Sequence, residues 1–374
     1  MGDATTFTAP APAAHRVWTP LGFLAGALIL ASCITVLTAS SASAASNTIW
    51  VDGASHGGRC SDAPGRDGRT ATAPLCTLTR AASLARSGDT VTVRAATYRE
   101  TLRPTTSGTA TAPIRFTAEA GATIDANGAR TAISISGHHD LVLSGFAVTG
   151  ATAQAVWVDN AAAVTLTSLR ISRNQAPAVQ VRNTSSLTVS SSTISDNKGA
   201  GIMELGGVRG AQYLADTITG NGRDGQPFNG DGIQLRGTGT TVRNCTITGN
   251  GDDPIYEHGI YASTEALGYL IGANQLSGNA GANIKAQGSG VIRYNRLGTA
   301  RLGLYVDHNA SPGVTFVSNV ITGQFQHAVM ANTGAQLRLV GNTITTTPSA
   351  TPGDHTTVFT PAGTLLEMRD NLVA

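Results

Sequence analysis

The sequence predicts an all-β fold, a solenoid of stacked parallel strands, and three observations carry this prediction. Short runs that alternate between apolar and other side chains recur along the chain at steps of 20 to 31 residues. None of these repeats contains a helical pattern. The chain also has 44 glycines and only 13% charged side chains, which suits a fold with many tight turns rather than disorder. A parallel β-helix satisfies all three observations.

The N-terminal residues 1–44 have the pattern of a signal peptide, which leaves residues 45–374 for the β-helix domain. Arg16 precedes an apolar run over residues 21–37, and an A-S-A sequence ends at Ala44 as a candidate cleavage site. The alternative for this run is a membrane anchor, because its length is close to that of a spanning helix.

A second alternative concerns Cys33. The sequence LASC that ends at Cys33 is similar to a bacterial lipobox, in which the cysteine is lipidated. With either leader the mature protein leaves the cytoplasm, so we expect it to be secreted or anchored at the cell surface, without a stable membrane span in the mature chain.

Two further cysteines agree with export. Cys60 and Cys76 flank a polar loop, and a disulfide that closes this loop is the simplest interpretation in an oxidising compartment. Its expected stabilisation is on the order of 3 kcal/mol. Cys245 is left over at a repeat position, where we expect a small buried side chain.

A short helix is predicted over residues 77–86, TLTRAASLAR, ended by Gly88. Because it precedes the repeats, it would cap the first coil and protect the open edge of its strands.

The repeated strands begin with AISI at Ala132 and continue to AVMA at Ala328. Asparagines mark the turns between them in two series, namely Asn244, Asn274, Asn295, Asn319, Asn342 and Asn371, then Asn221, Asn250 and Asn279. Stacked asparagines satisfy backbone groups in turns, so we expect a structural role for them.

Alternation at period two directs the third residue of each strand outward, and stacking at about 4.8 Å aligns these residues in a column. The predicted outward column is Ser134, Trp157, Gln180, Met203, Gln234, Tyr261, Lys285, Tyr305 and Met330. A flanking column is Asp159, Arg182, Leu205, Arg236, Ser263, Gln287, Asp307 and Asn332. Aromatic and amide groups in line suit a polysaccharide, and the candidate substrate-binding residues are Trp157, Gln234, Arg236, Tyr305 and Asp307. A solvated outer face is the alternative.

Carboxylates gather in one stretch of this charge-poor chain. Asp231, Asp252, Asp253, Glu257 and His258 all lie within residues 229–263. The net charge of +2 and the absence of a basic run argue against nucleic acid as a partner. We expect a monomer that binds an acidic polysaccharide.

The opening of the domain resembles a known family. From Trp50 to Glu100 the chain reads WVDGASHGGRCSDAPGRDGRTATAPLCTLTRAASLARSGDTVTVRAATYRE, in which APLCTL, SGDTV and AATY occupy the places of the opening motifs of secreted bacterial right-handed β-helix proteins. The calcium-dependent pectate lyases of polysaccharide lyase family nine share this opening. The resemblance implies a right-handed parallel β-helix with a short N-terminal capping helix.

The acidic stretch is also similar to the order of site residues in those lyases. The resemblance implies calcium bound by Asp231, Asp252, Asp253 and Glu257, with a lysine at Lys285, although the spacings are looser and the last acid is a glutamate.

β-Elimination from a uronate requires a neutralised substrate carboxylate and a base for the C5 proton. A cation held by carboxylates performs the first task. Lys285, flanked by two tyrosines, is a candidate base if its pKa is lowered, and a substrate-binding charge otherwise. Tyr261, Tyr305 or His258 would protonate the leaving oxygen.

Two alternatives stay open. The order NGDGI, DD, EHGI and NIK is similar to the motifs of secreted polygalacturonases, although one coil is missing and Asp231 and Glu257 would stand only about 5 Å apart if they were on neighbouring strands. The other alternative is a non-catalytic glycan-binding β-helix at the cell surface. Alginate lyases of similar shape have an arginine-histidine pair where this chain has Asp307-His308, which counts against that subclass.

Overall fold

A computed structural model describes residues 48–223, 225, 230–307, 313–345 and 356–374. The predicted signal peptide at residues 1–44 and the lipidation alternative at Cys33 lie outside these residues. Among the helices within them, none has the length and apolar character needed to cross a membrane.

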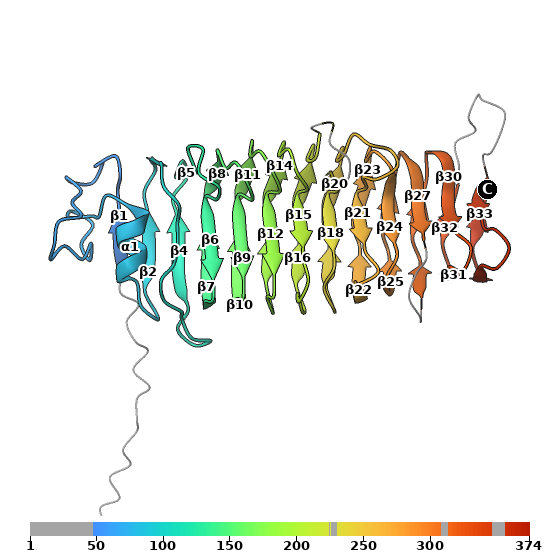
Figure 1. Cartoon of the computed structure of the whole chain (residues 1–374), viewed down its shortest axis with the longest axis horizontal. Coiled ribbons are helices and arrows are strands. Elements are labelled where there is room, and N and C mark those ends of the chain that lie inside the picture. Colours follow the sequence, from blue (N-terminus) through green and yellow to red (C-terminus); the bar gives the residue numbers. More distant parts are fainter. Residues whose placement is uncertain (1–47, 224, 226–229, 308–312, 346–355) are drawn as a thin grey trace, which may run out of the picture. The chain divides into compact units, whose positions relative to one another are not determined.

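Three parallel sheets make up the domain, and Figure 1 shows their strands as successive coils. The 13-stranded sheet contains, in spatial order, β1 (Thr48–Val51), β2 (Thr90–Val93), β4 (Ile114–Ala118), β7 (His139–Ser144), β10 (Ala162–Thr167), β13 (Thr188–Ser190), β16 (Gln212–Leu214), β19 (Thr241–Arg243), β22 (Leu267–Gly272), β25 (Ser289–Arg293), β28 (Val314–Val317), β31 (Gln336–Val340) and β34 (Leu365–Arg369). The 12-stranded sheet contains β3 (Thr97–Tyr98), β5 (Thr123–Asp125), β8 (Ala147–Thr149), β11 (Arg170–Ser172), β14 (Thr193–Ser195), β17 (Thr217–Thr219), β20 (Thr246–Thr248), β23 (Gln275–Ser277), β26 (Arg296–Leu297), β29 (Val320–Ile321), β32 (Thr343–Ile344) and β35 (Leu372–Val373). The ten-stranded sheet contains β6 (Ile133–Ser136), β9 (Val156–Asp159), β12 (Val179–Arg182), β15 (Ile202–Glu204), β18 (Ile233–Leu235), β21 (Ile260–Ala262), β24 (Ala282–Ala286), β27 (Ala300–Val306), β30 (Gln324–Ala331) and β33 (Val358–Phe359).

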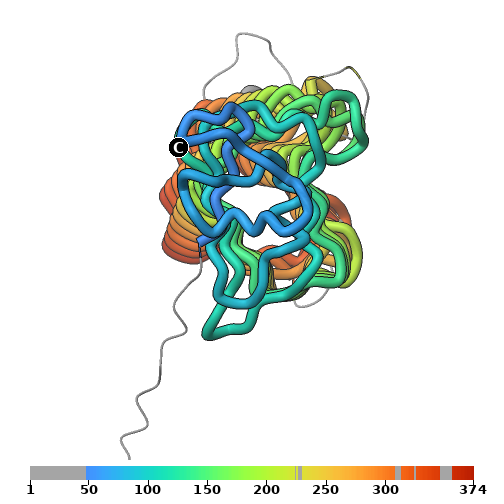
Figure 2. The backbone as a smooth tube through the Cα atoms, turned by 90° about the vertical axis from the view of Figure 1, so that its left-hand side faces the viewer, coloured from blue at the N-terminus to red at the C-terminus, as the bar shows by residue number. Residues whose placement is uncertain are grey.

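The core lies inside the coils, which superpose when viewed end on (Figure 2). Alternate residues of each strand point into it, as Val156 and Val158 of β9 do, and both are fully buried. Each such side chain contributes roughly 1.5–3 kcal/mol relative to an exposed one. The predicted parallel β-helix is therefore confirmed, and its repeat reflects one inward face per strand.

The asparagines form the predicted structural ladders. Asn295, for example, donates from its backbone N and its Nδ2 to Oδ1 of Asn319, at 2.8 and 2.9 Å. One assignment was wrong by a residue, because Cys245 rather than Asn244 occupies the ladder position and donates its backbone N–H to Oδ1 of Asn274. Asn244 precedes it with a φ of 57°, in the left-handed region that asparagine tolerates.

The capping helix α1 spans Leu78–Leu84, shorter than the predicted residues 77–86. Thr77 is the N-cap and its hydroxyl accepts a hydrogen bond from the Arg80 amide. Ala85 leaves the helical conformation with a ψ of 137°, which ends the helix early. The helix lies beside β1 and β2, at the first coils (Figure 1).

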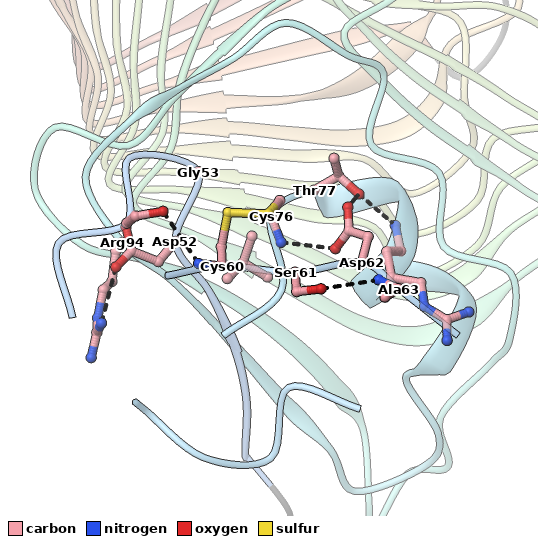
Figure 3. Close-up of a disulfide and its surroundings, with 12 residues drawn as sticks. Asp52, Gly53, Cys60, Ser61, Asp62, Ala63, Cys76, Thr77 and Arg94 are labelled. Carbon is pink, nitrogen blue, oxygen red and sulfur yellow. Dashed lines mark hydrogen bonds and ion pairs between the residues drawn. A yellow bond between two sulfur atoms is a disulfide. The ribbon is translucent and has the colours of Figure 1, made fainter. Parts of the chain in front are cut away.

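Cys60 and Cys76 form the predicted disulfide beside this helix (Figure 3). The Asp62 carboxylate accepts hydrogen bonds from the Cys76 amide at 2.8 Å and the Thr77 hydroxyl at 2.7 Å. The disulfide and this carboxylate together fix the polar loop against the N-terminus of α1.

Candidate functional site

The outward column of the ten-stranded sheet is the basis of the site. Strand register places the predicted outward residues opposite one another on consecutive strands, in the order Ser134, Trp157, Gln180, Met203, Gln234, Tyr261, Lys285, Tyr305 and Met330. Lys285 on β24 therefore lies between Tyr261 on β21 and Tyr305 on β27, as the repeat alignment predicted.

Lys285 lies over the faces of both tyrosines. Its Nζ is 5.5 Å from the ring centroid of Tyr261 and 5.2 Å from that of Tyr305, within the range of cation–π contacts. Asp307 is its counter-ion, with Oδ2 at 3.8 Å from Nζ. Only 15% of the Lys285 side chain is exposed, so the amine is held at a defined place on the surface.

A hydrogen-bond network holds these groups in place. The Tyr261 hydroxyl donates to Oε1 of Gln287 at 2.6 Å, and Gln287 Nε2 donates to Asp307 Oδ2 at 2.9 Å. Asn332 Nδ2 donates both to Asp307 Oδ1 at 2.7 Å and to the Tyr305 hydroxyl at 2.8 Å. Burial raises the pKa of both tyrosines, so they keep their protons at neutral pH.

A cavity of about 360 Å³ opens beside Lys285. It is lined by Pro254, Ile255, Tyr256, His258, Lys285, Arg301, Leu302, Tyr305 and Met330. Arg301 connects its wall to the overlying loop, because its Nη1 donates to the carbonyl of Pro254 at 3.0 Å. Two cationic side chains thus line one small cavity, an arrangement that favours an anionic ligand.

His258 lines the same cavity and is 2% exposed. Its Nδ1 accepts a hydrogen bond from the backbone N–H of Ala282 at 3.0 Å, so the proton of the neutral ring is on Nε2. Burial, together with the positive charges of Lys285 and Arg301, lowers the pKa of His258 to about 3. The ring is therefore a neutral hydrogen-bond donor near pH 7 rather than a base.

Asp231 and Glu257 have separate structural roles. Asp231 lies in the turn before β18 and accepts the backbone N–H of His258 at 2.8 Å, and burial raises the pKa of this carboxyl well above its ordinary 3.8. Glu257 is fully buried beneath its own loop, where Oε2 accepts the amides of Asp252 and Asp253 at 2.7 and 3.0 Å. The two carboxyls are near enough to interact, because the negative charge of Glu257 also raises the pKa of Asp231.

Asp252 and Asp253 likewise bind backbone. Oδ1 of Asp253 accepts the amides of Ile255 and Tyr256 at 2.7 and 3.1 Å, and Oδ2 of Asp252 accepts the Gly225 amide at 2.9 Å. Over the described residues, no group of three or more His, Cys, Asp or Glu side chains could hold a metal ion. The predicted calcium site stays a prediction, and these contacts do not support it.

The remaining substrate-binding candidates lie away from the cavity wall. Gln234 precedes Tyr261 in the column and is mostly buried, and Arg236 has its Nη1 at 3.8 Å from a Glu265 oxygen. Trp157 on β9 is five strands before Lys285, and the Arg182 guanidinium covers its ring at 5.3 Å. These residues extend the outward face but do not join the cavity.

Several residues of the site were missed at the level of sequence. Arg301, on β27, was not assigned to the site, and the network partners Gln287 and Asn332 were assigned only to the flanking column. The loop residues Ile255 and Tyr256 are 57% and 44% exposed. Two large apolar residues in an otherwise acidic loop were the signal in the sequence that could have identified this loop as part of the cavity wall.

Comparison with known proteins identifies the fold. A family model described as the right-handed beta helix region matches residues 120–207 and 215–344. The solved structure of XylC with xylose is 12% identical, covers 87% of this chain and 86% of its own, and has a TM-score of 0.65. A search among curated proteins finds none that matches this sequence.

Two further solved structures are similar at low identity. An alginate lyase from a Paenibacillus species is 18% identical and covers 78% of this chain and 96% of its own, with a TM-score of 0.53. The A-module of the Azotobacter vinelandii mannuronan C-5 epimerase AlgE4 is 14% identical and covers 77% of this chain and 87% of its own, with a TM-score of 0.54. At these identities the likeness shows the fold alone.

Proposed function

The chain belongs to the right-handed β-helix family, and from that premise we propose that it is a secreted lyase that cleaves a uronate-containing polysaccharide by β-elimination. The observation that carries the proposal is the cavity beside the outward column, which Lys285, Arg301 and His258 line together. An alginate lyase and a mannuronan C-5 epimerase among the structural neighbours are consistent with a polyuronate substrate.

The cavity groups match the needs of this reaction. Arg301 is always charged and meets the substrate carboxylate. Lys285 removes the C5 proton, the C5–H electrons form the C4–C5 double bond, and the bond from C4 to the glycosidic oxygen breaks. Tyr305 lines the cavity, and its hydroxyl, which is hydrogen-bonded to Asn332 and Asp307, gives its proton to the departing oxygen. Tyr261 does not line the cavity and its hydroxyl donates to Gln287, so its role here is to hold Lys285.

The contact between Lys285 and Asp307 supports a competing role, in which Lys285 binds the substrate carboxylate as an ammonium ion. Lys285→Arg separates the two roles because it keeps the charge but supplies no base near neutral pH. Cleavage that is lost in both Lys285→Arg and Lys285→Ala, with binding kept in Lys285→Arg, supports the base. Cleavage kept in Lys285→Arg supports the binding role.

No step of this mechanism uses calcium, although the resemblance to lyase family nine implies it. The four predicted ligands accept hydrogen bonds from backbone amides, and in this proposal Arg301 supplies the charge that a cation would otherwise provide. We therefore expect a chelator to leave the rate unchanged.

The contacts of the acids count against a polygalacturonase-like hydrolase, which needs two carboxyls about 6.5–9.5 Å apart that flank the bond to be cleaved. Beside the cavity, Asp307 accepts hydrogen bonds from Gln287 and Asn332, and Asp231 is 3% exposed. A non-catalytic glycan-binding protein would use the same cavity without turnover, and the assay below separates the three functions.

The disulfide Cys60–Cys76 supports the secreted location, because structural disulfides form in oxidising compartments.

The test is incubation with pectate, alginate and related uronans, with calcium or with a chelator. The proposal expects ultraviolet absorbance from unsaturated uronate ends in both conditions. New reducing ends without this absorbance indicate hydrolysis, and retained binding without either product indicates a binding protein.

A further inference from the structure

Within the described part of the chain, Nε2 of His258 is a buried hydrogen-bond donor whose lack of a partner the fold does not explain. The side chain is 2% exposed, and Nε2 is buried with no hydrogen-bond partner among the residues that the structure describes. A buried donor without a partner costs about 1–3 kcal/mol, so folding alone gives no reason for this one. The same residue lines the cavity that also contains Lys285 and Arg301.

The orientation of this ring is fixed from the opposite side. The Ala282 amide donates to Nδ1 at 3.0 Å, which forces the proton onto Nε2. Gly281 packs against the same nitrogen so closely that a Cβ there would lie 2.8 Å from Nδ1. The backbone of the next coil therefore positions the ring and sets its tautomer.

We propose that His258 Nε2–H is a neutral hydrogen-bond donor to the carboxylate of a bound uronate, completing a cavity in which Arg301 supplies the positive charge. The inference rests on the proposed function for the identity of the ligand. It assigns His258 a role different from the proton donor that the sequence suggested, because a neutral imidazole with Nδ1 occupied holds its proton and polarises the group that it contacts.

A carboxylate fits His258 and Arg301 better than a neutral sugar hydroxyl does. Hydrogen bonds from charged donors to a carboxylate are shorter and roughly twice as strong as neutral ones. In the elimination, charge moves from C5 onto the carboxylate oxygens, so a fixed donor at that position binds more strongly as the reaction proceeds. His258 would then stabilise the transition state without exchanging a proton.

The experiment is NMR of the full-length mature protein labelled with ¹⁵N-histidine, titrated with a methyl uronoside that has no glycosidic bond at C4 and so is not cleaved. The inference expects the Nε2–H tautomer of His258 in the free protein and a shift of the Nε2 signal with the uronoside. The matching neutral methyl glycoside and inorganic sulfate are the comparison ligands. A response to the neutral glycoside or to sulfate equal to that for the uronoside, or no response to any of the three, overturns the inference.

Two variants provide a second readout. His258→Leu is expected to weaken uronoside binding on the order of tenfold to a hundredfold, the range for a hydrogen bond to a charged group. His258→Gln retains a donor near the Nε2 position and is expected to recover part of the loss. Circular dichroism confirms that both variants are folded, and equal binding by Leu and Gln variants contradicts the proposal.

The outcome separates this inference from the proposed function. If the uronoside shifts the Nε2 signal but no uronan is cleaved, the carboxylate site stands and the lyase proposal fails. If uronan is cleaved and the Nε2 signal does not respond, His258 is not the donor and the lyase proposal stands.

Discussion

Asp216 occupies a position in one asparagine ladder that requires both a hydrogen-bond acceptor and a donor, and an ionised carboxylate supplies only the acceptor. Its Oδ1 accepts the Ser192 amide at 2.8 Å, as a ladder asparagine would, but Oδ2 is buried and has no partner among the described residues. At the equivalent atom, Ser192 and Cys245 donate to backbone carbonyls, Ser190 O at 2.9 Å and Tyr213 O at 3.5 Å. An ionised Asp216 has no proton to give, so we expect its neutral form in the folded protein.

The magnitude follows from the proton equilibrium. Burial raises the pKa of Asp216 from 3.8 to about 7, so the folded protein keeps a proton that the unfolded chain releases. This group therefore stabilises the fold fully below pH 3.8, and its contribution is lost as the pH rises to about 7. Because one pKa unit corresponds to about 1.4 kcal/mol, the free energy of unfolding falls by at most about 4 kcal/mol over this pH range. Asp216→Asn restores a donor that does not titrate.

The assay is denaturant unfolding of the wild type and Asp216→Asn at about pH 5 and about pH 9. At about pH 9 we expect the variant to be more stable than the wild type by up to a few kcal/mol. Between the two pH values its free energy of unfolding should change less than that of the wild type. The reasoning is refuted if both proteins lose the same free energy of unfolding between the two pH values, or if the variant is the less stable protein at the higher pH.

Three further substitutions test other parts of the structure. Tyr269→Phe removes a buried hydroxyl without a partner among the described residues, so its stability by thermal unfolding is expected to equal or exceed that of the wild type, and a large loss contradicts this. Gly281→Ala places a Cβ 2.8 Å from both Nδ1 of His258 and the carbonyl oxygen of Glu257, so it is expected to displace this segment and weaken uronoside binding in the NMR titration, whereas Gly206→Ala meets nothing within 4 Å and serves as its control. Glu100→Ala removes the acceptor of two amides at the N-terminus of α1 and is expected to cost about 1 kcal/mol, measured by denaturant unfolding, and an unchanged midpoint argues against this cap.

The outward column could be predicted from the sequence because the alternation of side chains and the repeat spacing follow from the geometry of the backbone. Lys285 between Tyr261 and Tyr305 follows from counting residues along successive coils. The ladder assignment at Asn244 was wrong by one residue, because the left-handed residue before each ladder position is itself often polar, and only the hydrogen bonds show that Cys245 takes the place.

The contacts of the four predicted calcium ligands could not be predicted in the same way. Asp231, Asp252, Asp253 and Glu257 lie in turns and loops, where a carboxylate can bind its own backbone as readily as a ligand. Their contacts depend on loop conformation, which period and spacing do not encode. The partnership of Arg301 with the Pro254 carbonyl, which connects two coils, was hidden for the same reason.

The most direct test of the central proposal follows an oligouronate by ¹H NMR in heavy water with the wild type, Lys285→Ala and, as a control, Gly206→Ala, whose added Cβ meets nothing within 4 Å. The lyase proposal predicts a new olefinic H4 signal with the wild type, its loss in Lys285→Ala and its persistence in Gly206→Ala. Deuterium at C5 without chain cleavage, new reducing ends without an olefin, or an unchanged olefin signal in Lys285→Ala would contradict it.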